Sequence, residues 1–163
     1  MNEVTTNLVV PVRRCTDKRG SLAPSSPVTL SSMLGEDVLP LSQLSDELAA
    51  IGVESRVRMG AASATVFVRR DRSFPRPEQY RLKIGEDGIE VVSSTAAGAY
   101  YALQTVRDLV RIHGATIPCC RIEDWPTINR RGVYFDCSRG KVPTVETVKI
   151  GRASCRERVY TKV

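Results

Sequence analysis

The spacing of apolar residues predicts two amphipathic helices. The first covers about ten residues between positions 41 and 51, and Gly52 after it is a typical stop signal. Its apolar side is formed by Leu41, Leu44, Leu48 and Ile51. The second covers about 17 residues, with Thr95 as a cap at its start and Gly114 at the C′ position after its end. The residues expected on its apolar side are Tyr100, Leu103, Val106, Leu109, Val110 and His113, and Tyr101 is also expected in the core.

Several shorter runs have the composition of strands. VTLSSM from Val28 is one, and ATVFVRR, rich in β-branched and aromatic residues, is another. Two further runs flank Gly-Glu-Asp-Gly at 85–88, which predicts a β-hairpin. Downstream, TIPCCRIEDWP is a short run closed by prolines, and Gly132–Cys137 is predicted to be a buried strand that ends at polar groups.

The order of these elements predicts an α+β fold. We expect a two-layer sandwich in which two helices cover one face of a mostly antiparallel sheet, over residues 28–127. Residues 1–27 are interpreted as a loose leader with at most one short strand, because SLAPSSP opposes regular structure. The strand at 132–137 is surplus to this sandwich and resembles the first element of a further domain.

Length and composition limit the protein class. The 163 residues suffice for about one domain and are too few for a complete (β/α)₈ barrel of about 250 residues. An apolar fraction of 42% with 26% charged residues is typical of a globular chain with a core. No run approaches the roughly 18 apolar residues of a membrane span, and the first residues lack the pattern of a signal peptide. We therefore expect a cytoplasmic protein without a membrane partner.

The net charge of +6 is unevenly distributed. Residues 150–163 hold four basic groups and one acidic group, or +3, so residues 1–149 also carry +3. This weakly basic body has no block of five or six like charges, so the sequence favours no nucleic-acid partner. The five cysteines show neither a disulfide framework nor zinc spacing, and we expect reduced, mostly buried thiols, no metal and no cofactor.

Three motifs together resemble glycoside hydrolase family 20, the β-N-acetylhexosaminidases. They are AAGAYYALQT at 96–105, I-x-D-x-P at 122–126, and RG-x-x-x-D-x-S-R at 131–139. The resemblance is close over residues 78–149 and looser over 28–77. It implies that 28–127 form the small α/β domain of that family and that 128–149 begin its catalytic TIM barrel, which is truncated here.

The end of the chain departs from the family pattern. After VPTVETVK the sequence changes to IGRASCRERVYTKV, and IGRASCRERV resembles the translation of a common sequencing-library adapter. Residues 150–163 are therefore interpreted as an artefactual tail, and the chain as an N-terminal fragment.

The resemblance points to two candidate substrate-binding residues. Arg139 corresponds to an arginine that hydrogen-bonds hydroxyls of the bound N-acetylhexosamine, and a guanidinium fork suits such paired acceptors. Asp136 is a candidate for contacting the sugar, for orienting Arg139 or for supporting the barrel. The alternative for Arg139 is a structural ion pair with Asp136 or a surface charge. Asp124 and Trp125 are expected in an inter-domain turn, Cys137 in a buried strand position, and His113 has no supporting catalytic motif.

The resemblance also implies a mechanism. In this family the acetamido oxygen of the substrate attacks the anomeric carbon, a glutamic acid protonates the leaving oxygen, and an aspartate orients the acetamide. That Asp-Glu pair belongs to a later barrel strand, so the 163-residue chain is expected to be inactive, while its parent hydrolyses terminal N-acetylhexosamine from glycans. Two alternatives remain: the support domain of another barrel glycosidase, such as an α-glucuronidase or an O-GlcNAcase-like enzyme, or a stand-alone basic binding module motivated by Arg69, Arg70, Arg72 and Arg76.

Overall fold

A computed structural model describes residues 4, 7–34, 38–61, 63–128 and 144–146 of the chain. The chain divides into two units, Met1–Thr127 and Ile128–Val163, and the helices and strands described below belong to the first. The predicted barrel strand at 132–137 lies outside the described residues.

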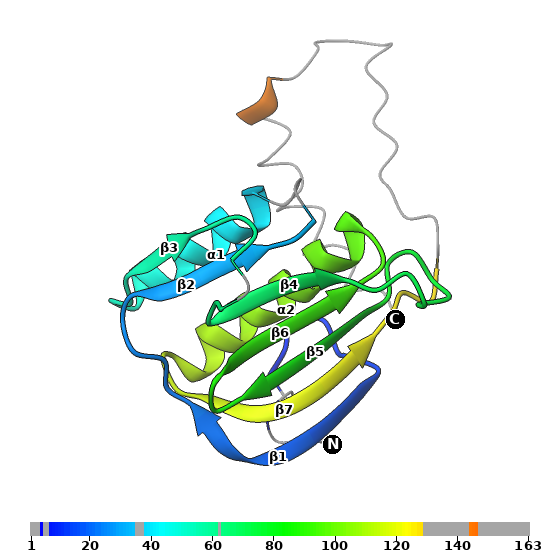
Figure 1. The fold of residues 1–163 in the computed structure, drawn as a ribbon. Coiled ribbons are helices and arrows are strands. Elements are labelled where there is room, and N and C mark those ends of the chain that lie inside the picture. Colours follow the sequence, from blue (N-terminus) through cyan, green and yellow to red (C-terminus); the bar gives the residue numbers. More distant parts are fainter. Residues whose placement is uncertain (1–3, 5–6, 35–37, 62, 129–143, 147–163) are drawn as a thin grey trace. The chain divides into compact units, whose positions relative to one another are not determined.

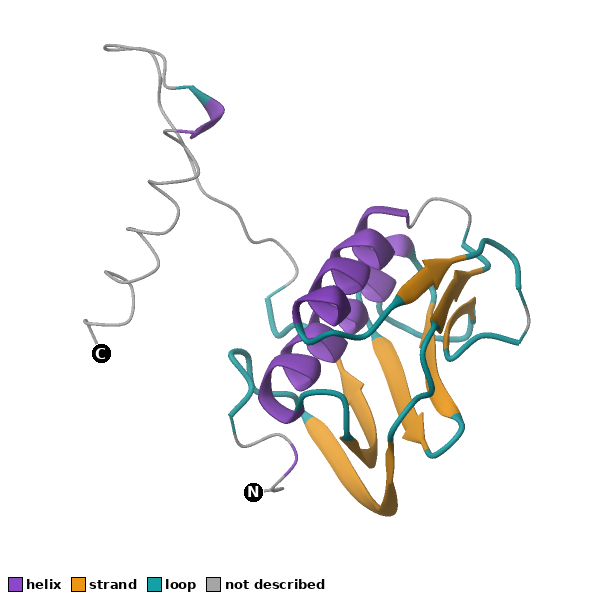
Figure 2. Ribbon diagram, turned by 90° about the vertical axis from the view of Figure 1, so that its left-hand side faces the viewer, coloured by secondary structure: helices purple, strands orange, loops and turns teal. Residues whose placement is uncertain are grey.

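The first unit contains one sheet and two helices (Figure 1). The strands are β1 (Arg14–Leu22), β2 (Val28–Ser32), β3 (Ser55–Val57), β4 (Val66–Arg70), β5 (Tyr80–Gly85), β6 (Gly88–Ser93) and β7 (Ile117–Asp124). The helices are α1 (Val38–Ala50) and α2 (Ala96–His113). Across the sheet the strands follow the order β1-β7-β5-β6-β4-β2-β3. Both helices cover the same face of the sheet, as predicted, and Figure 2 shows the two layers from the side.

The sheet is mixed, which corrects the prediction of a mostly antiparallel one. The pairs β1–β7, β7–β5 and β5–β6 are antiparallel, whereas β6–β4, β4–β2 and β2–β3 are parallel. Helix α1 connects the parallel neighbours β2 and β3, as parallel strands need a crossover. The apolar pattern locates strands but carries no information on their partners, which explains the error. The predicted hairpin is confirmed, with Gly85 opposite Gly88.

Residues 14–22 form a nine-residue edge strand where the sequence suggested a loose leader with at most one short strand. This strand pairs with β7, from Arg14 opposite Glu123 to Leu22 opposite Ile117. Seven of its nine residues are exposed at the edge of the sheet, so the segment lacks the alternation of a half-buried strand. The loose-leader prediction is therefore wrong for this segment.

The core lies between the sheet and the helices. Leu82 and Ile84 of β5 point toward the helices and are fully buried, whereas Lys83 between them is exposed. Leu41, Leu44 and Leu48 of α1 are buried as predicted. Ile51 is 38% exposed because α1 ends one residue earlier, which corrects its assignment to the apolar side.

Helix α2 confirms the predicted caps and corrects part of its predicted face. The Thr95 hydroxyl accepts a hydrogen bond from the Gly98 N–H at 3.2 Å, and the Gly114 N–H donates to the Val110 carbonyl at 2.8 Å. The buried side consists of Gly98, Ala99, Ala102, Leu103, Val106, Leu109 and Val110. Tyr100 and Tyr101 are 38% and 40% exposed, so their prediction as core is wrong. Small residues at the buried positions before Leu103 bring the helix too close to the sheet for tyrosine.

Gly98 explains the small residues of the AAGAYYALQT motif. A Cβ atom at this position would lie 2.8 Å from the Gln79 carbonyl oxygen and 3.0 Å from the Ser93 Cβ. The backbone of α2 therefore rests directly on the ends of β5 and β6, and any side chain larger than hydrogen would force the layers apart.

Candidate functional site

The two predicted substrate-binding residues, Arg139 and Asp136, lie outside the described residues, so their roles stay predictions. The I-x-D-x-P motif is described, and it stands at the end of β7, next to the boundary between the two units at Thr127. Its Ile122 is fully buried in the core.

Asp124 and Trp125 are fixed by the segment that precedes β1. The backbone N–H of Arg13 donates to Asp124 Oδ1 at 3.2 Å, and Arg13 Nε donates to the Trp125 carbonyl at 2.8 Å. Arg13 Nη2 also donates to the Thr127 hydroxyl. One arginine thus holds three of the four positions from Asp124 to Thr127, which fixes the direction in which the chain leaves the sheet.

Trp125 is surrounded by guanidinium groups. The Cζ atoms of Arg13, Arg14 and Arg76 lie 5.1, 5.3 and 4.8 Å from the centroid of its ring. Cation–π attraction of this kind favours positive charge over an indole face. Trp125 was expected to pack at a boundary between domains; in the first unit its neighbours are these arginines, and sequence reasoning missed Arg13 and Arg14 because they fall in the assumed leader.

A buried tyrosine lies behind this turn. The Tyr80 hydroxyl is 2.7 Å from the Thr105 hydroxyl and donates to Asp124 Oδ2 at 3.4 Å. Burial and the neighbouring Asp124 carboxylate raise the pKa of Tyr80 well above its ordinary range. The phenol is therefore neutral at physiological pH and links β5, α2 and β7 by hydrogen bonds, without access to a substrate.

Helix α1 carries an Asp-Glu pair, Asp46–Glu47, and its glutamate is engaged by α2. Arg111 donates to both Glu47 carboxylate oxygens at 2.7 Å, and Arg107 Nη2 donates to one of them at 3.3 Å. The Arg111 hydrogen bond is the main cause that lowers the pKa of Glu47. A general acid needs a raised pKa, so this glutamate is electrostatically unsuited to protonating a leaving group.

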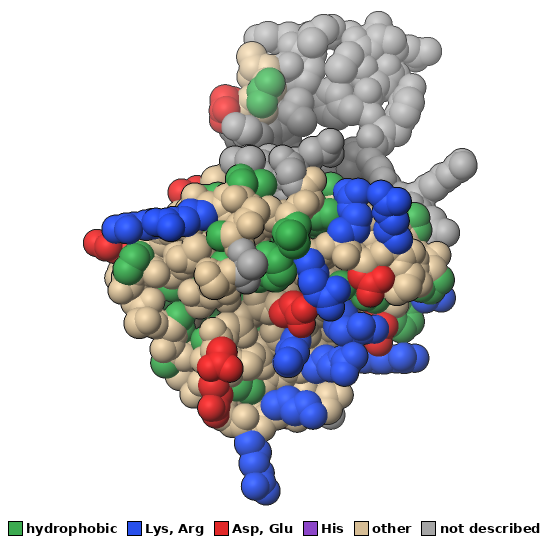
Figure 3. All heavy atoms as spheres, viewed as in Figure 1, with side chains coloured by type: hydrophobic (Ala, Val, Ile, Leu, Met, Phe, Trp, Pro, Cys, Tyr) green, Lys and Arg blue, Asp and Glu red, His purple; other side chains and the backbone are tan. Residues whose placement is uncertain are grey.

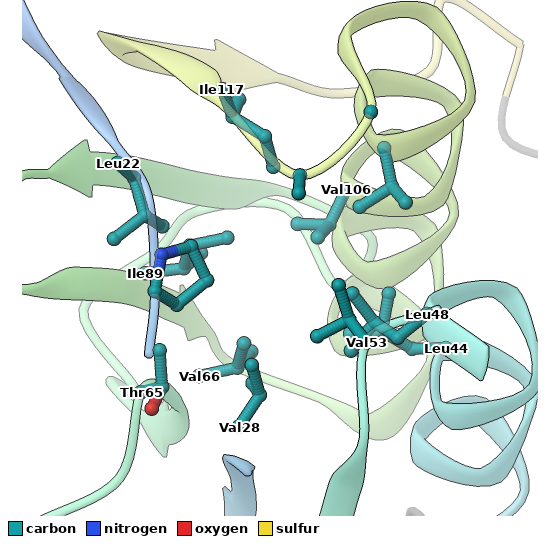
Figure 4. Close-up of a pocket in the computed structure, with 14 residues that line it drawn as sticks. Leu22, Val28, Leu44, Leu48, Val53, Thr65, Val66, Ile89, Val106 and Ile117 are labelled. Carbon is teal, nitrogen blue, oxygen red and sulfur yellow. The ribbon is translucent and has the colours of Figure 1, made fainter. Parts of the chain in front are cut away.

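The cavity between the layers offers no room for a substrate (Figure 4). Its volume is about 20 Å³, enough for about one water molecule. It is enclosed mainly by aliphatic side chains, including Leu22, Val28, Leu48, Val66 and Ile117. The cavity is a packing gap near the end of α2.

The described residues hold no reactive centre of another kind. They include no group of three or more His, Cys, Asp or Glu side chains placed to bind a metal ion. Cys119 and Cys120 are buried free thiols, and burial raises the pKa of Cys120 to about 12, which leaves it protonated and unreactive. In the same part of the chain, no helix has the length and apolar character to cross a membrane.

The comparisons with known proteins assign the family of this α/β unit. The family model for glycosyl hydrolase family 20, domain 2, matches residues 9–125. This chain belongs to glycosyl hydrolase family 20. The match begins five residues before β1, which places that strand inside the domain.

Relatives by sequence carry the names of this family's enzymes. The chain is 30% identical over 123 residues to β-hexosaminidase B of Pseudoalteromonas piscicida, covering 76% of this chain and 15% of the relative. It is 32% identical over 102 residues to β-N-acetylhexosaminidase of Cellulomonas fimi, covering 60% of this chain and 21% of the relative. The chain thus spans about a fifth or less of the length of these curated relatives.

Solved structures share the fold. The exo-β-N-acetylglucosaminidase of Vibrio harveyi, in complex with N-acetylglucosamine, matches with a TM-score of 0.67 and 21% identity, over 85% of this chain and 22% of that one. The Flavobacterium johnsoniae chitobiase matches with a TM-score of 0.64 and 17% identity, over 86% of this chain and 24% of that one. At these identities the likeness establishes the fold of the small domain.

Proposed function

We propose that residues 28–127, together with β1, form the support domain of a β-N-acetylhexosaminidase that removes terminal non-reducing N-acetylhexosamine residues from glycans. The family match over residues 9–125 is the observation that carries this proposal. The length of the relatives supports a parent several times longer than this chain. Residues 128–149 would begin its catalytic barrel, and 150–163 would be artefactual.

The proposed chemistry is substrate-assisted and retaining. The acetamido oxygen attacks the anomeric carbon and forms an oxazolinium-like intermediate, while a glutamic acid protonates the leaving oxygen. The 163-residue chain would be inactive because the catalytic Asp-Glu pair belongs to the missing barrel, and the Asp-Glu pair of α1 is no substitute, since Glu47 is held as a carboxylate by Arg111 and Arg107. The acid and its aspartate partner would lie on a later barrel strand of the parent.

Within this proposal the domain has a mechanical role. The hydrogen bonds from Arg13 to the end of β7, and from Tyr80 to Asp124, fix the point from which the chain continues toward the barrel. Arg139 would bind hydroxyls of the terminal sugar, and Asp136 would orient its guanidinium.

The experiment is to recover the source gene beyond codon 149 and assay the restored protein with a chromogenic N-acetylglucosaminide. We expect the parent to hydrolyse it and the 163-residue chain to be inactive.

In the parent, Arg139→Ala should lose about 2–5 kcal/mol of transition-state stabilisation, and Arg139→Lys should recover little because an ammonium group lacks the guanidinium fork. Genomic DNA that reproduces IGRASCRERVYTKV followed by a stop codon would refute the proposal, and near-normal kcat/KM in Arg139→Ala would remove Arg139 from the sugar site.

A further inference from the structure

The face of the sheet opposite the helices carries a concentrated positive charge. Because side chains alternate along each strand, the register places Arg14, Glu123 and Arg81 in one row across β1, β7 and β5. Thr16, Arg121 and Lys83 form the next row. Adjacent strands are about 4.8 Å apart, so these rows form a continuous surface.

We define the basic face as these basic residues together with the arginines around Trp125: Arg13, Arg14, Arg76, Arg81, Lys83 and Arg121. Glu123 is the acidic residue within it, at 3.8 Å from Arg14 and 3.9 Å from Arg81. Two further acidic residues border it: Glu90 of β6, which stands opposite Lys83 and pairs with Arg69 at 2.6 Å, and Asp71 after β4, which interacts electrostatically with Arg69 and Arg81. Figure 3 views this side of the molecule and shows Lys and Arg side chains gathered over the region of β5, β7 and β1. Positive charge therefore exceeds negative charge on the basic face.

Lys83 and Arg121 are the centre of this excess. They stand directly opposite each other on antiparallel strands, and both are exposed. Like charges in such positions repel each other. Lys83 also stands directly opposite Glu90 of β6, but the carboxylate of Glu90 pairs with Arg69, and neither Lys83 nor Arg121 forms an ion pair with another described residue. Directly opposed Cβ atoms are about 5 Å apart, so one bound carboxylate group reaches both side chains and removes the repulsion.

The two aromatic rings in contact with the basic face are already covered by guanidinium groups. Arg81 lies over the Phe74 ring at 5.1 Å, and Arg13, Arg14 and Arg76 surround Trp125. Single-stranded nucleic acids are bound largely by stacking of bases on free aromatic faces, which these rings do not offer. Guanidinium groups held on aromatic rings are well placed for two-pronged hydrogen bonds to carboxylates.

We propose that the basic face binds an acidic polysaccharide, a glycan whose sugar units carry carboxylate groups. Charge complementarity requires a polyanion, the covered aromatic rings disfavour nucleic acid, and the choice of a glycan rests on the proposed function. The inference deepens that function: the parent's substrate chain combines N-acetylhexosamine with uronate units, and the basic face holds the chain while the barrel acts on its end.

The test is binding of the 163-residue chain to hyaluronan oligosaccharides, which alternate a uronate with N-acetylglucosamine, measured by calorimetry at low salt. Chitohexaose, a neutral polymer of N-acetylglucosamine, isolates the contribution of the carboxylates. We expect binding of hyaluronan that weakens with salt, and little binding of chitohexaose. The double variant Lys83→Gln/Arg121→Gln should bind hyaluronan about tenfold more weakly.

A matched control removes the same charge from the far edge of the sheet. Arg56 and Arg58 are exposed, at or just after β3, which is separated from β5 by β6, β4 and β2. Arg56→Gln/Arg58→Gln should retain affinity within about threefold, and circular dichroism confirms that both variants are folded. Three outcomes would overturn the proposal: the two double variants lose the same affinity for hyaluronan, chitohexaose binds as tightly as hyaluronan, or hyaluronan does not bind.

A single-stranded DNA oligonucleotide of equal charge is the second probe. Tighter binding of DNA than of hyaluronan, lost in the Lys83→Gln/Arg121→Gln variant, would replace the glycan by a nucleic acid and overturn the inference. These outcomes are independent of the activity assay on the restored parent, so failure of the basic face and failure of the proposed function are distinguishable.

Discussion

Neighbouring residues of β5 show how differently the two faces of the sheet are built. Leu82 points toward the helices and is fully buried, whereas Lys83 is exposed on the basic face opposite Arg121. On the helix side, Glu47 is matched by two guanidinium groups, because it accepts hydrogen bonds from both Arg107 and Arg111. Positive charges on the basic face outnumber the carboxylate among them. The helix side therefore stabilises the fold, and the basic face retains charge that is available to a ligand.

Substitutions at Leu82 and Lys83 should show the largest difference between the two faces in their effect on the free energy of unfolding. Leu82→Ala removes buried methyl groups and leaves a cavity, so we expect the free energy of unfolding to fall by about 2–5 kcal/mol. Lys83→Ala, one residue along, should change it by at most about 0.5 kcal/mol. Urea denaturation of both variants measures the contrast, and similar changes would show that the faces do not differ in this way.

A substitution at the contact between α2 and the sheet should lower the free energy of unfolding almost as much as Leu82→Ala. Gly98→Ala places a Cβ 2.8 Å from the Gln79 carbonyl oxygen, and the forced separation should lower the free energy of unfolding by about 1–3 kcal/mol. Exposed Ala97 on the same turn provides the control, and Ala97→Ser should cost about 0.5 kcal/mol. A more stable Gly98→Ala protein, as helix propensity alone predicts, would contradict the close approach.

Glu47 should make the stability of the helix layer depend on pH. Its folded-state pKa is lowered below its ordinary value of 4.5, chiefly by Arg111, so its contribution is fully present above that value and is lost as the pH falls through the folded pKa. We expect Glu47→Gln to cost about 1–2 kcal/mol at neutral pH, with the difference shrinking in acid. Unfolding measured from pH 7 to pH 3 tests this.

Exposed Asp46 is the matched control for that measurement. Asp46→Asn removes one carboxylate from the same helix, and we expect it to leave the pH dependence nearly unchanged. If Asp46→Asn and Glu47→Gln changed the pH dependence of the free energy of unfolding equally, net charge would be its cause, rather than the hydrogen bonds from Arg111 and Arg107.

The smallest effect is expected on the basic face in the absence of ligand. Lys83→Gln/Arg121→Gln removes a like-charge pair across β5 and β7, but it also removes the opposite-charge pair of Lys83 and Glu90 across β5 and β6. The two effects offset each other, so the free energy of unfolding should change by at most about 0.5 kcal/mol. Near 1 M salt this change should disappear, because screening weakens both interactions. A loss of more than about 1 kcal/mol would show that these side chains support the fold instead.

Local features of the fold were predictable because short-range interactions determine them. The Thr95 cap, the Gly114 stop and the hairpin around 85–88 each depend on a few adjacent residues, and the structure confirms them. The assignment of Tyr100 to the core failed because the depth of a helical position depends on how closely the helix approaches the sheet. The candidate residues Arg139 and Asp136 rest on the family resemblance and stay predictions.

The sequence by itself determined the two helices, most of the strands and the family, because periodicity, caps and motifs are properties of neighbouring residues. Tertiary structure alone decided the parallel half of the sheet, the edge strand β1 and the arginine cluster on Trp125. Arg13 and Trp125 are 112 residues apart in the chain and meet only because β1 pairs with β7. Contacts of this range depend on the folding of the whole sheet, and no local pattern encodes them.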